Sequence, residues 1–301
     1  MNKDLKKTID WLYRHGRPID VARYEFLFLG KNRELLEKTL SSYQNSDGGF
    51  AHGLEPDFKN PNSTALQCWM AFTVIDELKL DVNNEIVVNL IDYLVNKAPK
   101  KEGMFLSTIP SNNDYPHAQW WSYQEGAEVW GYNPTIAIAG FIYKYAGINE
   151  KYRKFARELI QRAIDDFNAR PTDEMHEIRA FLDMINYVKD LKEFNDSDEF
   201  LKKILQRIEA NIEKNSELWF TTYCVRPLQF FDVPNTFAYD LYRDLAKKEA
   251  MMILDSRNAS GIWEITWQWS EYPDDRVIAK REWQSSMAIG YLKILKDHNI
   301  I

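Results

Sequence analysis

The architecture can be inferred outward from one stretch, Gln44-Asn45-Ser46-Asp47-Gly48-Gly49-Phe50-Ala51-His52-Gly53-Leu54-Glu55-Pro56-Asp57. A segment of helical pattern ends before it near Tyr43, and another begins after it near Ser63. The pair Gly48-Gly49 can adopt positive φ and lets the backbone approach a neighbouring segment closely. We therefore expect a long link between two helices, with acids and a histidine concentrated in it.

Composition and charge restrict the class of protein. The chain has 301 residues, enough for one large domain or two average ones, and a net charge of −7 with no basic stripe. This distribution argues against nucleic-acid binding. The two cysteines cannot build a disulfide framework and indicate a reducing compartment. The N-terminal residues do not resemble a signal peptide, and the longest apolar run, 136–143, is too short to cross a bilayer. We expect a cytoplasmic protein without a transmembrane segment.

Helical periodicity without sustained strand alternation predicts an all-α chain. Asn62 or Ser63 is expected to cap the helix that follows the first long link, and Pro134 to occupy the first helical position of another. The predicted helices cover 3–15, 19–29, 32–43, 63–80, 84–97, 133–146, 150–168, 173–191, 198–214, 220–231 (interrupted by a proline), 234–254 and 281–297.

The links between these helices alternate between short and long. The long ones are 44–62, 98–132 and 257–280, and every second connection in an array of antiparallel helix pairs lies at the same end. We therefore expect the long loops to share one rim. A Gly-x-aromatic motif recurs in each of them, as Gly48-Gly49-Phe50, Gly103-Met104-Phe105 and Gly261-Ile262-Trp263. This recurrence predicts stacked helix pairs, and we expect residues 1–301 to form a single α/α toroid of about five or six pairs.

A second pattern around the opening stretch supports the toroid. Leu40, Gln44, Gly48 and Phe50 match Leu-x3-Gln-x3-Gly-x-(Phe/Trp). This pattern resembles the QW repeat of squalene and terpenoid cyclases and the related repeat of protein prenyltransferase β-subunits. The resemblance implies an α/α toroid in which the glutamine and the aromatic residue tie each helix-to-helix loop to the next repeat.

The catalytic motifs of those families are missing. The chain has no Asp-x-Asp-Asp motif, and Asp165-Asp166 lacks the third acid of Asp-Asp-x-x-Asp. Cys224 has no neighbouring Asp-x-Cys of the kind that binds zinc in prenyltransferases. The resemblance therefore implies a scaffold and an apolar cavity, and it assigns no reaction.

Acids and histidines cluster in the first two long loops. General acid–base catalysis needs a proton donor and an acceptor within reach of each other. We expect His52 or His117 to carry the proton, with Asp57 or Glu55 as partner and Glu125 as a further catalytic candidate. The alternative is that these are solvated loop charges and turn residues. No His-x3-His or Cys-x2-Cys spacing indicates a metal site, and the cofactor is unknown.

Aromatic residues mark the second and third long loops. Six of the ten tryptophans lie there, and such rings at a cavity mouth stack on sugars, stabilise carbocations or grip isoprenoid chains. They could instead form an apolar lid. Arg226 could bind a carboxylate or phosphate, or form a structural ion pair. The residues expected to bind ligand are Asp47, Trp120, Trp121, Arg226, Trp263 and Trp267.

Three functions remain open on these grounds. The first is a terpenoid-cyclase- or prenyltransferase-like protein that binds a small or extended ligand in an aromatic- and acid-lined cavity, with no reaction assigned. The second is a carbohydrate-active (α/α)6 hydrolase, lyase or epimerase that uses paired carboxylates such as Asp57 and Glu125. The third is a non-catalytic peptide-binding module. The sequence does not identify the oligomeric state.

Overall fold

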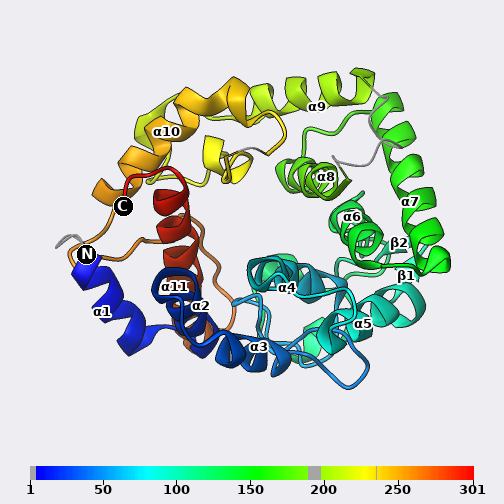
Figure 1. Ribbon diagram of the computed structural model, residues 1–301, viewed down its shortest axis with the longest axis horizontal. Coiled ribbons are helices and arrows are strands. Elements are labelled where there is room, and N and C mark those ends of the chain that lie inside the picture. Colours follow the sequence, from blue (N-terminus) through cyan, green and yellow to red (C-terminus); the bar gives the residue numbers. More distant parts are fainter. Residues whose placement is uncertain (1–4, 189–197, 235) are drawn as a thin grey trace. The chain divides into compact units, whose positions relative to one another are not determined.

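A computed structural model of the chain describes residues 5–188, 198–234 and 236–301. The chain divides into two compact units: a central unit, Tyr43–Asn211, and a terminal unit, Met1–Ser42 together with Ile212–Ile301. In the described residues the regular structure is helical apart from one two-stranded sheet (Figure 1). The prediction of an all-α chain is confirmed, whereas the toroid and the single domain over 1–301 stay predictions.

The central unit contains two layers of helices. Each helix contacts a neighbour in its own layer or a helix of the other layer. Figure 1 shows that successive helices along the chain alternate between the two layers. One layer consists of α4 (Ala65–Leu78), α6 (Thr135–Tyr145) and α8 (Met175–Val188). The second consists of α5 (Glu85–Asp92), α7 (Glu150–Ala169) and α9 (Asp198–Asn211). Successive helices thus belong to alternate layers, which is the arrangement expected of stacked helix pairs.

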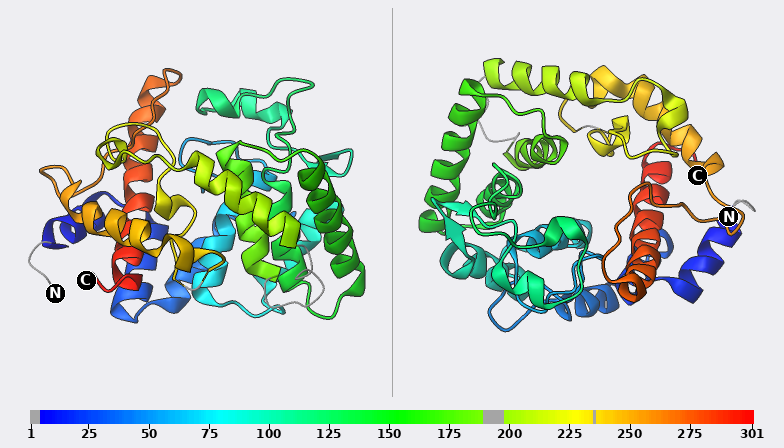
Figure 2. Two further views of the ribbon diagram at one scale, coloured as in Figure 1. Left: turned by 90° about the horizontal axis from the view of Figure 1, so that it is seen from above. Right: turned by 180° about the vertical axis from the view of Figure 1, so that it is seen from behind.

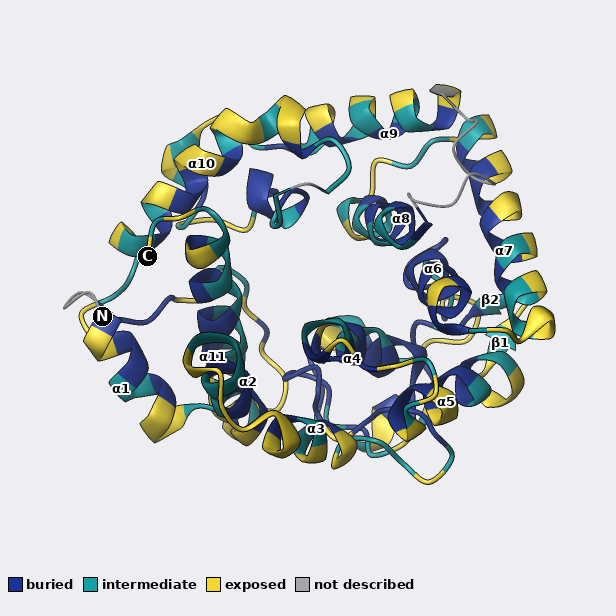
Figure 3. Cartoon of the chain, in the orientation of Figure 1, coloured by how far each residue is buried: buried dark blue, intermediate teal, exposed yellow. Residues whose placement is uncertain are grey.

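The sequence explains why α6 and α7 occupy different layers. Helix α7 buries only a stripe with helical spacing, and its remaining residues are exposed or partly buried (Figure 3). That stripe consists of Ala156, Leu159, Ile160, Ala163, Ile164 and Phe167. Helix α6 is buried on nearly all sides because it is almost wholly apolar. At Gly140 a Cβ atom would lie 2.7 Å from the Cα of Met184, so glycine allows α6 and α8 to approach closely.

Polar contacts hold one end of the first layer together. Asp76, near the end of α4, accepts hydrogen bonds from Lys144 Nζ at 2.8 Å and Tyr145 Oη at 2.6 Å. Its other oxygen accepts from Tyr187 Oη on α8 at 2.7 Å. One carboxylate therefore links α4, α6 and α8.

Short elements fill the links of the central unit. Figure 2 shows residues 106–134, which connect β2 with α6, at one end of the helices of this unit. The short elements are the π-helical turn η2 (Tyr93–Lys97), the strands β1 (Lys100–Lys101) and β2 (Met104–Phe105), and the 3-10 turns η3 (Pro110–Asp114) and η4 (Gln119–Trp121). The strands pair antiparallel, Lys100 with Phe105.

The terminal unit packs its helices around α11. This helix contacts α1, α2 and α10, and α2 also contacts α3. Leu12 and Ile289 belong to its apolar core, and the Arg17 amide donates to Ser285 Oγ at 3.0 Å. The helices are α1 (Lys6–His15), α2 (Pro18–Leu29), α3 (Arg33–Ser41), α10 (Tyr239–Asp255) and α11 (Pro273–Asp297), and the 3-10 turns are η6 (Ser216–Leu218) and η7 (Pro227–Gln229).

Several predicted boundaries differ from the structure. The helix predicted over 220–231 is wrong, because only the turn η7 forms where Pro227 interrupts the segment. Helix α11 begins at Pro273 rather than at 281, with proline at its first position and two acids in its first turn. The cap of α4 is Thr64, whose side chain accepts from the Gln67 amide, rather than Asn62 or Ser63. Pro134 is the N-cap of α6 and not its first helical residue.

No helix among the described residues is both long and apolar enough to cross a membrane.

Candidate functional site

The loop after α3 is tied to the next helix pair by Gln44. Its Nε2 atom donates to the carbonyl of Gly48 at 2.9 Å and to that of Ile86, on α5, at 3.0 Å. Gln44 also pairs with Phe50 in an isolated β-bridge, and Phe50 is fully buried. The glutamine and the aromatic residue of the repeat pattern therefore fix the shape of this loop and attach it to α5.

Two glycines allow the loop to approach α5 and Ser63 closely. Gly48 has φ +96°, and a Cβ atom there would lie 2.2 Å from the carbonyl oxygen of Asn89. A Cβ atom on Gly49 would lie 2.4 Å from the Cβ of Ser63. Both positions require glycine, since any side chain would displace backbone or a buried neighbour.

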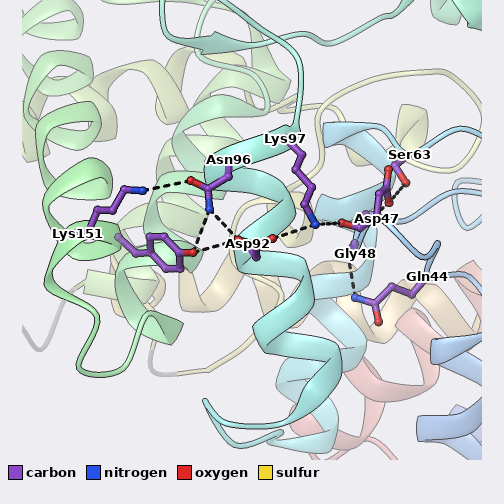
Figure 4. Close-up of polar contacts among 10 residues, drawn as sticks. Gln44, Asp47, Gly48, Ser63, Asp92, Asn96, Lys97 and Lys151 are labelled. Atoms are coloured by element: carbon purple, nitrogen blue, oxygen red, sulfur yellow. Dashed lines mark hydrogen bonds and ion pairs between the residues drawn. The ribbon is translucent and has the colours of Figure 1, made fainter.

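One face of this loop borders an open polar pocket of about 470 Å³. Figure 4 shows its core: Asp47 Oδ1 accepts from Ser63 Oγ at 2.8 Å, and Lys97 Nζ donates to the Asp47 carbonyl at 2.8 Å. Lys97 also lies 2.9 Å from Asp92, and hydrogen bonds from Lys97 and Asn96 hold the pKa of Asp92 below its usual value. The pocket is lined by Asn45, Ser46, Asp47, Pro61, Asn62, Ser63, Tyr93, Lys97 and Pro99.

The predicted ligand residue Asp47 is thus a structural part of the pocket wall. Its Oδ1 atom also accepts from the Gly49 amide at 2.9 Å, so the carboxylate stabilises the turn that contains it. Lys97 remains half-exposed, with 47% of its side chain accessible, and supplies the cation of the pocket. Such a wall suits a small polar ligand.

The other face of the loop meets the second long loop. The Lys59 amide donates to the Pro116 carbonyl at 2.9 Å, and the Ala118 amide donates to the Asp57 carbonyl at 2.9 Å. Phe58 and His117 form an isolated antiparallel bridge. Within the central unit, segments 44–62 and 98–132 therefore lie side by side, and the candidates Asp57 and His117 are brought onto adjacent strands.

A carboxylate and a row of aromatic rings meet at this junction. Asp57 is 3% exposed, and its Oδ1 atom accepts a hydrogen bond from Trp121 Nε1 at 2.9 Å. The Trp121 ring stacks with Phe58 at 5.2 Å and with Trp130 at 5.6 Å between ring centroids. The indole N–H fixes the orientation of the carboxylate, and the rings provide an apolar environment beside it, in which only Trp130 is partly exposed.

A second candidate acid, Glu55, belongs to a turn whose backbone is held by α4. The Glu55 amide donates to Gln67 Oε1 at 2.9 Å, while Gln67 Nε2 donates to the Phe58 carbonyl at 2.7 Å. Glu55 is 7% exposed. The buried side chain of Gln67 thus clamps the turn that contains both candidate acids, a role that sequence reasoning missed.

The two candidate histidines have different surroundings. His52 is exposed and its Nε2 atom lies 2.8 Å from Asn45 Oδ1. His117 is buried, with Nδ1 at 2.6 Å from the Tyr115 carbonyl and Nε2 at 3.0 Å from Ser122 Oγ. Because amide and carbonyl oxygens only accept, His52 Nε2 and His117 Nδ1 carry the protons. Of the two, His117 has the ring whose orientation is fixed by contacts at both nitrogens, which suits proton transfer.

The remaining candidates of the central unit lie closer to solvent. Trp120 is half-buried and Glu125 is exposed, although both belong to the same segment as His117. Their accessibility leaves them able to touch a ligand.

Three predicted ligand residues belong to the terminal unit. Arg226 Nη2 donates to Tyr291 Oη at 2.8 Å and its Nε lies 3.4 Å from Glu249, so the arginine is part of a buried ion pair. Trp263 is 1% exposed and donates to the Ile253 carbonyl, which makes it a core residue. Trp267 is half-buried and packs edge-to-face on Trp283 with centroids 5.2 Å apart.

Burial raises the pKa of Glu249 to about 7, although the charge of Arg226 opposes this effect. Its Oε2 atom accepts from the Leu228 amide at 2.7 Å. The carboxyl group is fully buried. In the folded chain it therefore keeps its proton at a pH where a solvated glutamate is already ionised.

Within the described ranges, no group of three or more histidine, cysteine, aspartate or glutamate side chains is arranged to hold a metal ion. The chain matches no protein-family model, and no curated protein or solved structure is significantly similar to it.

Proposed function

We propose that the chain is a terpenoid-cyclase- or prenyltransferase-like α/α-toroid protein that binds a small or extended organic ligand beside loops 44–62 and 98–132. The observation that carries the proposal is the pairing of Asp57 with Trp121 next to stacked aromatic rings. The alternating helix layers of the central unit and the attachment of Gln44 to α5 support the repeat scaffold. The reaction is left unassigned.

The chemistry of this pairing suits a ligand with a large apolar part. Phe58 and Trp121 are buried, and the partly exposed rings of Trp120 and Trp130 are the ones that an isoprenoid chain or the face of a sugar can contact. Their electron-rich faces also attract a positive charge that develops on a ligand. The carboxylate of Asp57, held by an indole N–H, adds a fixed negative group to the same place.

A second candidate, a carbohydrate-active enzyme, is favoured by the contrast between two carboxylates. Asp57 is buried and Glu125 is exposed, although both belong to the paired loops. Glycoside hydrolysis needs two carboxyl groups whose environments keep one protonated and the other ionised.

The experiment is a thermal-denaturation screen of the full chain against two ligand sets. One set contains isoprenoid diphosphates with Mg²⁺ or Zn²⁺, and the other contains oligosaccharides and uronic acids. A ligand at a hundred times its dissociation constant stabilises the fold by about 2.7 kcal/mol. This corresponds to a midpoint shift of about 4 °C for a chain of this length.

Each outcome selects between the candidates. A shift with the diphosphates supports the terpenoid-cyclase-like proposal, and a shift with the sugars replaces it with the glycan candidate. If neither set shifts the midpoint, both candidates are wrong and the peptide-binding alternative remains.

A further inference from the structure

The loop that contains His117 also positions a serine hydroxyl against its imidazole. Ser122 Oγ lies 3.0 Å from His117 Nε2, and the Tyr115 carbonyl oxygen lies 2.6 Å from Nδ1. A carbonyl oxygen can only accept, so Nδ1 carries the proton of the neutral ring. Nε2 then offers its lone pair to the Ser122 hydroxyl. This is the order of contacts that a serine nucleophile, its general base and an orienting group require.

The base is held rigidly while the hydroxyl remains accessible. His117 is buried and bridges to Phe58, and the next residue, Ala118, donates its amide to the Asp57 carbonyl at 2.9 Å. Ser122 is exposed, and its amide donates to the Gln119 carbonyl at the end of the turn η4. The turn η4 brings the chain back so that the hydroxyl of Ser122 reaches the ring of His117. A fixed base beside an exposed hydroxyl suits attack on a ligand that arrives from solvent.

We propose that Ser122 is a nucleophile activated by His117 and that it acts on carboxylic esters. This goes beyond ligand binding, because it assigns a covalent step. Ser122 Oγ forms a bond with the acyl carbon while its proton passes to His117 Nε2. The carbon–oxygen bond to the alcohol breaks, and the alcohol leaves with the proton from His117. Water, deprotonated by the same nitrogen, then cleaves the acyl-serine and restores the hydroxyl.

The surroundings define the kind of ester. Trp121, the residue before the nucleophile, is buried and stacks with Trp130, whose partly exposed ring is the aromatic group that an apolar or ring-shaped substituent can contact. The orienting group is a neutral carbonyl instead of a carboxylate, which stabilises the imidazolium less than a complete triad does. We therefore expect rapid covalent modification of Ser122 by reactive reagents and slow turnover of ordinary esters.

The test uses a fluorophosphonate probe on the full chain, followed by mass-spectrometric mapping of the modified peptide. The predicted result is a single adduct on Ser122 in the wild-type chain. His117→Gln should slow labelling at least about 100-fold, which is the usual contribution of a general base. Ser260→Ala, which removes an exposed serine of the terminal unit, should label at the wild-type rate.

Two results would overturn the proposal. One is the absence of an adduct on wild-type Ser122 under conditions that label a known serine esterase. The other is equal labelling rates for wild type and His117→Gln at an unchanged melting midpoint. The wild-type mapping needs no variant to fold. Neither result bears on the ligand screen, which measures reversible binding, so the two proposals can fail separately.

Discussion

Replacing Gly48 by alanine should destabilise the central unit by considerably more than an ordinary surface substitution. Gly48 has φ +96°, and a Cβ atom there would lie 2.2 Å from the carbonyl oxygen and 2.8 Å from the carbonyl carbon of Asn89. Positive φ costs an L-residue about 1–2 kcal/mol. Displacing the backbone of α5 to make room adds about 1–3 kcal/mol, as other overpacked sites do. The expected loss of unfolding free energy is therefore about 2–5 kcal/mol.

Gly126 provides the matched control. It has φ +87°, but no atom lies within 4 Å of the position of its Cβ. Gly126→Ala should lower the unfolding free energy only by the cost of positive φ, about 1–2 kcal/mol. The assay is urea unfolding of wild type and both variants, followed by circular dichroism, with the slope of each transition compared to verify that the same unit unfolds.

The difference in unfolding free energy between Gly48→Ala and Gly126→Ala measures the cost of the close approach of the loop to α5. An unfolding free energy of Gly48→Ala equal to that of Gly126→Ala would refute the reasoning. It would mean that the loop does not lie against Asn89 in solution.

Three further predictions concern polar contacts. Gln44→Met removes the donor that the carbonyls of Gly48 and Ile86 share, and should cost about 1–3 kcal/mol in urea unfolding; an unchanged midpoint would contradict this. Asp76→Asn weakens the link of α4 to α6 and α8 and should lower stability by about 1–3 kcal/mol in the same assay, with no loss if the three donors are solvated instead. Glu249 has a folded-state pKa raised to about 7, so the folded chain holds a proton that the unfolded chain loses above its ordinary value. The stability of the wild type should fall as the pH rises from about 4.5 to 7, Glu249→Gln should flatten this fall in the melting midpoint, and parallel pH profiles would contradict the assignment.

Local patterns made much of the helical structure predictable. The apolar spacing of α7 and the unbroken apolar run of α6 are visible in the sequence, and so is the glycine pair in the link between α3 and α4. The start of α11 was missed because Val277 and Ile278 are exposed, so its first turns lack a buried face. Pro273 and the two acids after it were the available signal for that start.

The candidate site was predictable only in part. The alternation of loop lengths indicated that segments 44–62 and 98–132 would meet, and backbone hydrogen bonds join them in the central unit. The bond between Asp57 and Trp121 joins residues that are 64 positions apart, and no local period encodes such a pair. The contact between Ser122 and His117 was not predictable, because it depends on the turn η4, which the spacing His-x4-Ser does not indicate.

The tryptophans show a further limit of sequence reasoning. Trp121 and Trp263 both lie in long loops, yet Trp121 bonds to a carboxylate and Trp263 donates to a backbone carbonyl inside the terminal unit. Composition cannot distinguish these roles, because both rings are buried and both N–H groups need an acceptor.

The central claim is that Asp57 and its aromatic neighbours bind the ligand. The most direct test measures the melting midpoints of wild type, Asp57→Asn and Asp114→Asn with both ligand sets. Asp114 is an exposed acid of the same loop segment that carries Trp121, and its substitution is the matched control. The account predicts a shift of about 4 °C with one ligand set for wild type and Asp114→Asn, and its loss in Asp57→Asn. An equal shift in all three chains would contradict it.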